Sequence, residues 1–182
     1  MSDRTTPSPS NSAQTRHRIP FGSPPYRLPR GALPACQGED PELFFPSAGY
    51  EKRQEQVARA KRICARCLCN RDCLRLALHN DEPVGIWGGC TTTERRVLRN
   101  DIRSLRREPH PALRSLERGE TVPVDPFDLL GVVHRLTVRG LTMPWLCKVL
   151  NLTPETVLRL QIRGARAAAL VESEQREARE AT

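Results

Sequence analysis

The chain has few aromatic residues and no long apolar run. Aromatic side chains account for 4% of its 182 residues, and 16 prolines interrupt it, so one large hydrophobic core is not expected. No stretch reaches the roughly 18 apolar residues that cross a membrane. The first residues also lack the basic-then-apolar pattern of a secretory signal. These absences predict small folded units in a cytoplasmic protein that has no membrane partner.

Residue sets typical of enzymes are absent as well. No Ser/His/Asp set, phosphate-binding loop or carboxylate pair stands out, and the few histidines are scattered along the chain. The C-x2-C pair of Cys64 and Cys67 lacks the βαβ pattern that surrounds thioredoxin-type motifs. The sequence therefore predicts a protein that is not an enzyme. A protein disulfide reductase acting through these two thiols is the catalytic alternative.

The cysteines carry most of the information in this sequence. There are seven, an odd number, which in a reducing compartment favours metal ligation or redox chemistry over a disulfide framework. Cys64 and Cys67 lie one helical turn apart, so both sulfurs can face the same way. Cys73 can return to that side after a short turn, and Cys36 is the only upstream cysteine that can complete a set of four.

Two kinds of site fit four thiols with this spacing. Thiolates select zinc or iron–sulfur clusters over hard cations. Structural zinc sites usually use two ligand pairs, whereas this set has one pair and two single cysteines. The spacing therefore favours a cluster, with a zinc-stabilised DNA-binding protein as the alternative.

Apolar periodicity and helix-breaking residues predict an all-α chain with two folded units. The first is a small helical bundle organised around the four cysteines, with one helix near 51–66 and a second helix that Asp72 caps. The second is a small helical unit after a segment rich in proline. The predicted boundaries are 1–34 for a disordered Pro/Ser/Arg-rich tail, 35–108 for the cysteine unit, 109–124 for a linker, 125–171 for the second unit and 172–182 for a frayed helical tail.

The net charge of +8 is unevenly distributed. Residues 36–90 carry eight basic and eight acidic side chains, whereas residues 91–118 carry eight arginines and four acidic side chains. Six of these arginines lie on a predicted helix that a Thr91–Glu94 capping box opens. Because a planar guanidinium suits phosphate groups, we expect DNA contacts from Arg95, Arg96, Arg99, Arg103, Arg106 and Arg107.

Three glycines surround one tryptophan between the cysteines and the basic helix. This pattern predicts a tight turn that presents an indole ring. A tryptophan on such a turn can anchor a protein partner, although it could instead cover a small hydrophobic cluster. The predicted partner contacts are Gly85, Trp87, Gly88 and Gly89.

The last two predicted helices have the spacing of a helix-turn-helix motif. That motif needs a small residue, a left-handed turn residue, an apolar residue and a β-branched residue in order. These roles fall to Cys147, Asn151, Leu152 and Val157. A purely structural or dimerising unit is the alternative. The side chains expected to face a DNA groove are Glu155, Thr156, Arg159 and Arg163.

Together these motifs resemble the WhiB-like family of actinobacterial transcription regulators. The resemblance covers about residues 34–108, and its motifs occur in the order typical of the family. The matching parts are Ala35-Cys36, Asp40-Pro-Glu-Leu-Phe-Phe-Pro46, Cys64-x2-Cys67-x5-Cys73, Gly85-Ile-Trp-Gly-Gly89 and the arginine-rich helix that follows.

The resemblance implies a redox-sensing regulator. It implies sensitivity to oxygen and nitric oxide through a [4Fe-4S] cluster held by Cys36, Cys64, Cys67 and Cys73. It also implies docking on region 4 of the primary sigma factor of RNA polymerase through the turn at Trp87, with DNA contacts after it. Two features depart from the family. Typical members end soon after the basic helix, and Cys69 and Cys90 are extra thiols that could be inert, exchange as ligands or form a disulfide bond in the cluster-free protein.

Overall fold

The computed structural model describes residues 33–47 and 50–180, and this part of the chain is helical. The only β-bridge in the described part is an isolated antiparallel one between Trp87 and Cys90. The predicted all-α class is therefore confirmed, whereas the predicted disorder before residue 33 lies outside the described residues. The elements are η1 (Pro41–Phe44), α1 (Tyr50–Ala65), α2 (Asn70–His79), α3 (Thr92–Arg106), α4 (Leu113–Glu117), α5 (Leu129–Val138), α6 (Met143–Leu150) and α7 (Pro154–Glu180).

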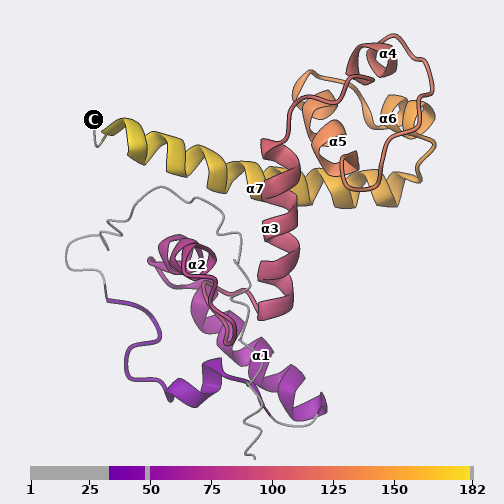
Figure 1. Cartoon of the computed structure of the whole chain (residues 1–182). Coiled ribbons are helices and arrows are strands. Elements are labelled where there is room, and N and C mark those ends of the chain that lie inside the picture. Colours follow the sequence, from indigo (N-terminus) through magenta and orange to yellow (C-terminus); the bar gives the residue numbers. More distant parts are fainter. Residues whose placement is uncertain (1–32, 48–49, 181–182) are drawn as a thin grey trace, which may run out of the picture.

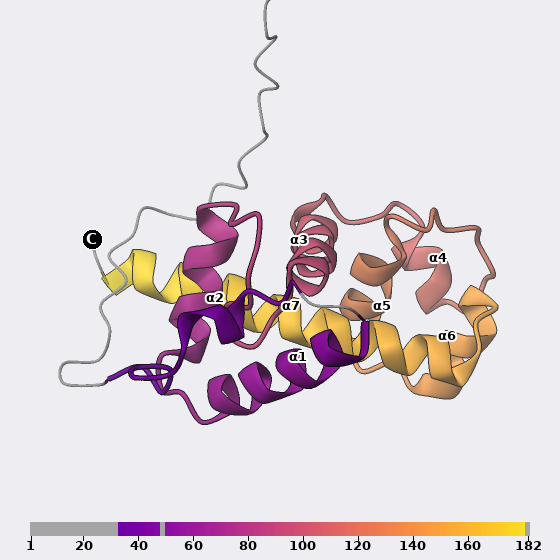
Figure 2. The same ribbon diagram turned by 90° about the horizontal axis from the view of Figure 1, so that it is seen from below.

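The helices form two groups that α3 and α7 connect. Helices α1 and α2 lie with η1 on one side, and α4, α5 and α6 lie on the other (Figure 1). Helix α3 leads from the first group to the second. Helix α7 begins in the second group, crosses α3 and extends back to α2 (Figure 2). None of the described helices is long and apolar enough to cross a membrane.

Three small hydrophobic clusters stabilise this arrangement in place of one large core. Each fully buried leucine or isoleucine contributes about 1.5–3 kcal/mol. The cluster around α1 contains Leu43, Ala60, Ile63, Cys64 and Ile86. The cluster between α2, α3 and α7 contains Leu74, Leu78, Cys90, Leu98, Ile102, Ala167 and Leu170. The cluster of the second group contains eleven buried residues from α4 to α7 and the residue before α4, among them Leu116, Val133, Leu136, Leu146 and Val157.

Local sequence correctly predicted one helix start and missed another. The capping box is present, because Glu94 N–H donates to Thr91 Oγ1 at 3.3 Å and Thr91 N–H donates to Glu94 Oε2 at 2.8 Å. The sequence predicted that Asp72 caps α2. Asp72 instead lies in the first turn of α2, and Cys69 is the N-cap residue. The helix starts earlier because Asn70 Nδ2 donates to the carbonyl of Cys64 at 2.6 Å, which closes the turn between α1 and α2.

Two predicted boundaries differ from the structure. Residues 109–124 are not a bare linker, because Leu113 and Leu116, three residues apart on α4, are buried in the second group. Helix α7 continues to Glu180, so residues 172–180 belong to one continuous helix and not to a frayed tail. Its far end is held against α3 by an ion pair of 2.6 Å between Arg106 and Glu174.

Candidate metal centre

The thiol groups of five cysteines line one cavity in the first group of helices. The cavity has a volume of about 330 Å³, and its other walls include the apolar side chains of Pro34, Ile63 and Leu76. The structure thus brings the four predicted ligands to one place and adds a fifth thiol. The lining cysteines are Cys36, Cys64, Cys67, Cys69 and Cys73.

Separate segments deliver these thiols. Cys64 lies in the last turn of α1 and Cys73 in the first turns of α2, so the short turn between the helices places both beside the cavity. Cys36 comes from the turn before η1. That segment is held on α1 by buried Leu43 and by Gln56 Nε2, which donates to the carbonyl of Glu42 at 2.7 Å.

Backbone N–H groups point at three of the sulfurs. Ala35 N–H donates to Cys67 Sγ at 3.4 Å, and Gly88 N–H donates to Cys73 Sγ at 3.2 Å. Gly89 N–H bonds to the thiol of Cys64. Hydrogen bonds to ligating sulfurs offset thiolate charge and tune the potential of iron–sulfur clusters. The backbone is thus arranged for thiolates.

The thiols of Cys64 and Cys73 resist ionisation. Burial raises the pKa of the Cys64 thiol, and it raises the pKa of Cys73 to about 11. Hydrogen bonds from the N–H groups of Gly89 and Gly88 lower the pKa values of Cys64 and Cys73 in part, whereas neighbouring thiols raise them further. Several thiolates in an apolar cavity repel one another. A positively charged metal centre would compensate them, and its binding would release the thiol protons.

A single zinc ion and a cluster make different geometric demands on the thiols. Among the described residues, no three His, Cys, Asp or Glu side chains converge closely enough to hold one metal ion. A zinc site places every sulfur about 2.3 Å from the same ion. A cluster distributes its cysteine ligands over several irons, so it accepts thiols that line a cavity without meeting at one point.

The glycine-tryptophan turn lies against the start of α2. Gly88 has a φ of +51°, and a Cβ atom there would be 2.3 Å from the carbonyl oxygen of Asn70, so only glycine fits. Trp87 and Cys90 exchange backbone hydrogen bonds of 3.0 and 2.9 Å. The indole N–H of Trp87 donates to the carbonyl of Val84 at 3.0 Å, and the ring is half-buried. The turn predicted from sequence is present, and its contact with a partner stays a prediction.

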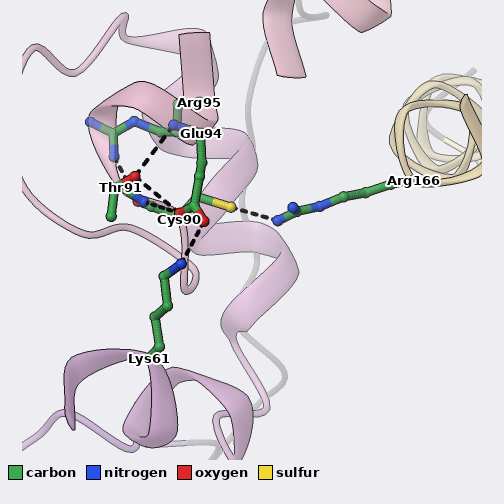
Figure 3. Close-up of polar contacts among 6 residues, drawn as sticks. All are labelled: Lys61, Cys90, Thr91, Glu94, Arg95 and Arg166. Atoms are coloured by element: carbon green, nitrogen blue, oxygen red, sulfur yellow. Dashed lines mark hydrogen bonds and ion pairs between the residues drawn. The ribbon is translucent and has the colours of Figure 1, made fainter. Parts of the chain in front are cut away.

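Arg95 is a structural residue and not a DNA contact, which corrects the sequence-based prediction. Its side chain is fully buried. Its Nη1 donates to the carbonyls of Gly85 at 2.7 Å and Cys90 at 2.9 Å, and its Nη2 donates to those of Glu82 and Val84. Figure 3 shows Arg95 beside Cys90 at the start of α3. Its place on the same helical stripe as Leu98 and Ile102 is a signal that sequence analysis could have used.

The remaining arginines of α3 are only partly available to a nucleic acid. Arg96 and Arg103 are exposed, and Arg103 donates to Asn100 Oδ1 at 3.3 Å. Others form ion pairs: Arg99 with Asp81 at 2.5 Å, Arg106 with Glu174 at 2.6 Å and Arg107 with Asp128 at 2.7 Å. The second group of helices therefore neutralises part of the basic face of α3.

The turn between α6 and α7 has the local features that the sequence indicated. Asn151 is left-handed, with φ of 51° and ψ of 48°. Val157 is fully buried, and Cys147 and Leu152 pack against the same cluster. DNA binding by this turn and its helices stays a prediction.

All four of the predicted groove-facing residues have partners within the protein. Thr156 is half-buried, and its backbone N–H donates to Thr153 Oγ1 at 3.3 Å. Arg159 is exposed and pairs with Glu155 at 3.0 Å. Arg163 donates to both carboxylate oxygens of buried Asp101 on α3 at 3.0 and 2.5 Å. Its guanidinium is therefore held by a carboxylate of α3, while 39% of the side chain stays exposed, and its contact with a groove stays a prediction.

These features define a small helical domain centred on thiols, followed by a helical extension that packs back on it. A family model described as "Transcription factor WhiB" matches residues 32–98. Transcriptional regulator WhiB1 of Mycobacterium tuberculosis is 44% identical over 64 residues, which cover 35% of this chain and 76% of that protein. WhiB1 of Bifidobacterium longum is 38% identical over 76 residues, covering 42% and 83%. Transcriptional regulator WhiB of Streptomyces coelicolor is 45% identical over 64 residues, covering 35% and 68%.

The chain belongs to the WhiB family of transcriptional regulators. This confirms the family suggested by the sequence motifs, and the relatives are named as regulators and not as enzymes. The family model ends within α3, so helices α4 to α7 lie outside it.

Proposed function

We propose that this transcriptional regulator senses oxidants or nitric oxide through a [4Fe-4S] cluster. The ligands are Cys36, Cys64, Cys67 and Cys73. The main support is the single cavity lined by these thiols, with apolar walls and backbone N–H donors on three of the sulfurs. When bound, the cluster supplies a redox-active centre that reacts with these small molecules.

The chain's own residues give the site its properties. Ile63 and Leu76 give the cavity apolar walls, and the N–H groups of Ala35 and Gly88 offset negative charge at the sulfurs. The four ligands come from separate segments, so the bound group links those segments together. Its loss frees the thiols and loosens the turn that contains Trp87.

The proposed partners are promoter DNA and region 4 of the primary sigma factor. DNA contacts are assigned to exposed Arg96 and Arg103 on α3, and to Thr156 and Arg159 at the start of α7. The sigma-factor contact is assigned to the half-buried ring of Trp87 and the glycines beside it. Family membership supports regulation of transcription, and the exposed arginines support the DNA contact.

Disulfide reductase activity is less consistent with the site. A reductase needs an accessible thiolate at the pH of the cell. Cys64 is only 8% exposed, and burial raises the pKa of its thiol. Both features lower its reactivity as a nucleophile.

Anaerobic purification should yield a coloured protein with about four irons and four sulfides per chain. The measurement is an absorption spectrum combined with iron, sulfide and zinc analysis, because iron–sulfur centres absorb visible light and zinc does not. Colourless protein with one zinc per chain would instead support the structural zinc alternative.

Replacing Arg159 with alanine should weaken DNA binding by the second group of helices. Loss of one phosphate contact is expected to reduce the slope of log affinity against log salt by about one. The measurement is a fluorescence-anisotropy titration of promoter DNA at several salt concentrations. Arg176→Ala, which removes an exposed arginine near the other end of α7, is the matched control. Equal affinities and slopes for both variants would leave the start of α7 with a purely structural role.

A further inference from the structure

The segment from Trp87 to Cys90 contacts the thiol site on one side and α7 on the other. On the first side, Gly88 N–H donates to Cys73 Sγ at 3.2 Å and Gly89 N–H bonds to the thiol of Cys64. On the second side, Arg166 Nη2 of α7 lies 2.6 Å from Cys90 Sγ and donates to it (Figure 3). Three consecutive residues thus connect two ligand thiols with the C-terminal helix.

Cys90 is held so firmly that it can transmit a displacement. Its side chain is 1% exposed and packs in the cluster with Leu98 and Leu170. Its backbone pairs with Trp87, and its carbonyl accepts from Arg95 Nη1 at 2.9 Å. A shift of the sulfur therefore requires a shift of the backbone beside the ligands.

The same segment is attached to α1 through α3. Lys61 Nζ of α1 lies 2.5 Å from Glu94 Oε1, and Glu94 Oε2 accepts from Thr91 N–H, the residue after Cys90 (Figure 3). Cys64 lies one turn after Lys61 on α1. The polar contacts drawn in Figure 3 therefore extend from the helix that carries a ligand to Arg166.

Helix α7 carries this contact toward the proposed DNA surface. It is continuous from Pro154 to Glu180 and is fixed on α3 by the bidentate pair of Arg163 with Asp101. Arg159 and Arg166 are seven residues apart, which is about 10 Å along a helix. A change at Cys90 thus reaches the start of α7 through one rigid element.

We infer that Arg166 is a positioning residue for the thiol site. Through Cys90 it holds the N–H donors of Gly88 and Gly89 on Cys73 and Cys64. Because coupling between two sites is reciprocal, binding of the cluster in turn favours the docking of α7. This inference rests on the proposed function. Arg166 lies outside the residues that match the family model, so the coupling is a property of the C-terminal extension.

The test measures how fast the full-length protein loses its cluster. Wild type and Arg166→Met are incubated with an iron chelator without oxygen, and visible absorption and visible circular dichroism are followed. Methionine keeps the aliphatic packing of the exposed arginine but cannot donate to sulfur. We expect the variant to lose its cluster roughly fivefold faster, which corresponds to the loss of about 1 kcal/mol, one hydrogen bond. Its dichroism should also change because the donors move.

A double-mutant cycle with Cys90→Ala separates positioning from general destabilisation. If Arg166 acts through the sulfur of Cys90, then Arg166→Met should cause no further change in a Cys90→Ala background. Equal rates of cluster loss for wild type and Arg166→Met would overturn the inference but not the proposed function. The same conclusion would follow if Arg166→Met still accelerated cluster loss in the Cys90→Ala background. Wild-type protein that takes up no cluster would overturn the proposed function as well.

Discussion

Cys64→Ser is expected to abolish cluster binding, with less than about a tenth of the wild-type iron retained. Cys64 lies in the last turn of α1, is 8% exposed, and accepts a hydrogen bond from Gly89 N–H. A serine hydroxyl at this position keeps the size of the side chain but does not provide a soft, anionic ligand. The measurement is iron and sulfide content with visible absorption after anaerobic purification.

Cys69→Ser is the matched control for this prediction. Cys69 is also buried and lines the same cavity, but it is not among the four assigned ligands. Its replacement should leave the iron content unchanged. If Cys69→Ser lost the cluster and Cys64→Ser retained it, the ligand assignment would be wrong and the fifth thiol would belong to the set.

Loss of the cluster should also loosen the fold around it. Cys36, Cys64 and Cys73 come from different segments, and the hydrophobic cluster nearest to them has only five buried residues. Metal binding contributes directly to folding in domains with so small a core. Faster hydrogen exchange at Trp87 and Gly88 in Cys64→Ser would show that ligation and the turn are linked.

Short-range patterns predicted the parts of the site that depend on neighbouring residues. Three-residue spacing placed Cys64 and Cys67 beside one cavity, although α1 ends at Ala65 before the second thiol. A backbone bond of 3.1 Å from Cys67 N–H to the carbonyl of Cys64 closes a single turn between them. The Thr91–Glu94 pair formed the expected capping box because both of its bonds are local. Asn151 adopted the left-handed conformation because a short polar side chain tolerates it.

The parts that the sequence did not predict depend on distant contacts. Composition alone did not distinguish buried Arg95 from exposed Arg96, since the partners of Arg95 are backbone carbonyls, which every residue has. Likewise, the partner of Arg163 is Asp101, 62 residues earlier in the chain. The packing of α7 on α3 therefore emerged only from the folded structure. It narrows the DNA contacts proposed on α3 to its exposed arginines, beside those already predicted at the start of α7.

Arg95→Ala is expected to lower the free energy of unfolding by about 3 kcal/mol, because several buried acceptors lose their donors together. The guanidinium of Arg95 donates to the carbonyls of Gly85 and Cys90, which lie at the two ends of the glycine-tryptophan turn. Urea unfolding followed by far-ultraviolet circular dichroism measures this change. The turn also supplies the N–H donors to Cys64 and Cys73, so the variant should lose its cluster faster than wild type.

Arg96→Ala provides the control, because it removes the neighbouring arginine, which is exposed on the same helix. A surface substitution of this kind usually changes stability by no more than about 0.5 kcal/mol. It should instead weaken DNA binding, because Arg96 is among the exposed arginines assigned to phosphate contact. Lower stability in Arg95→Ala and weaker DNA binding in Arg96→Ala would show that the first residue maintains the turn and the second contacts DNA. If both variants unfolded at the same urea concentration as wild type, the hydrogen bonds of Arg95 would not stabilise the turn.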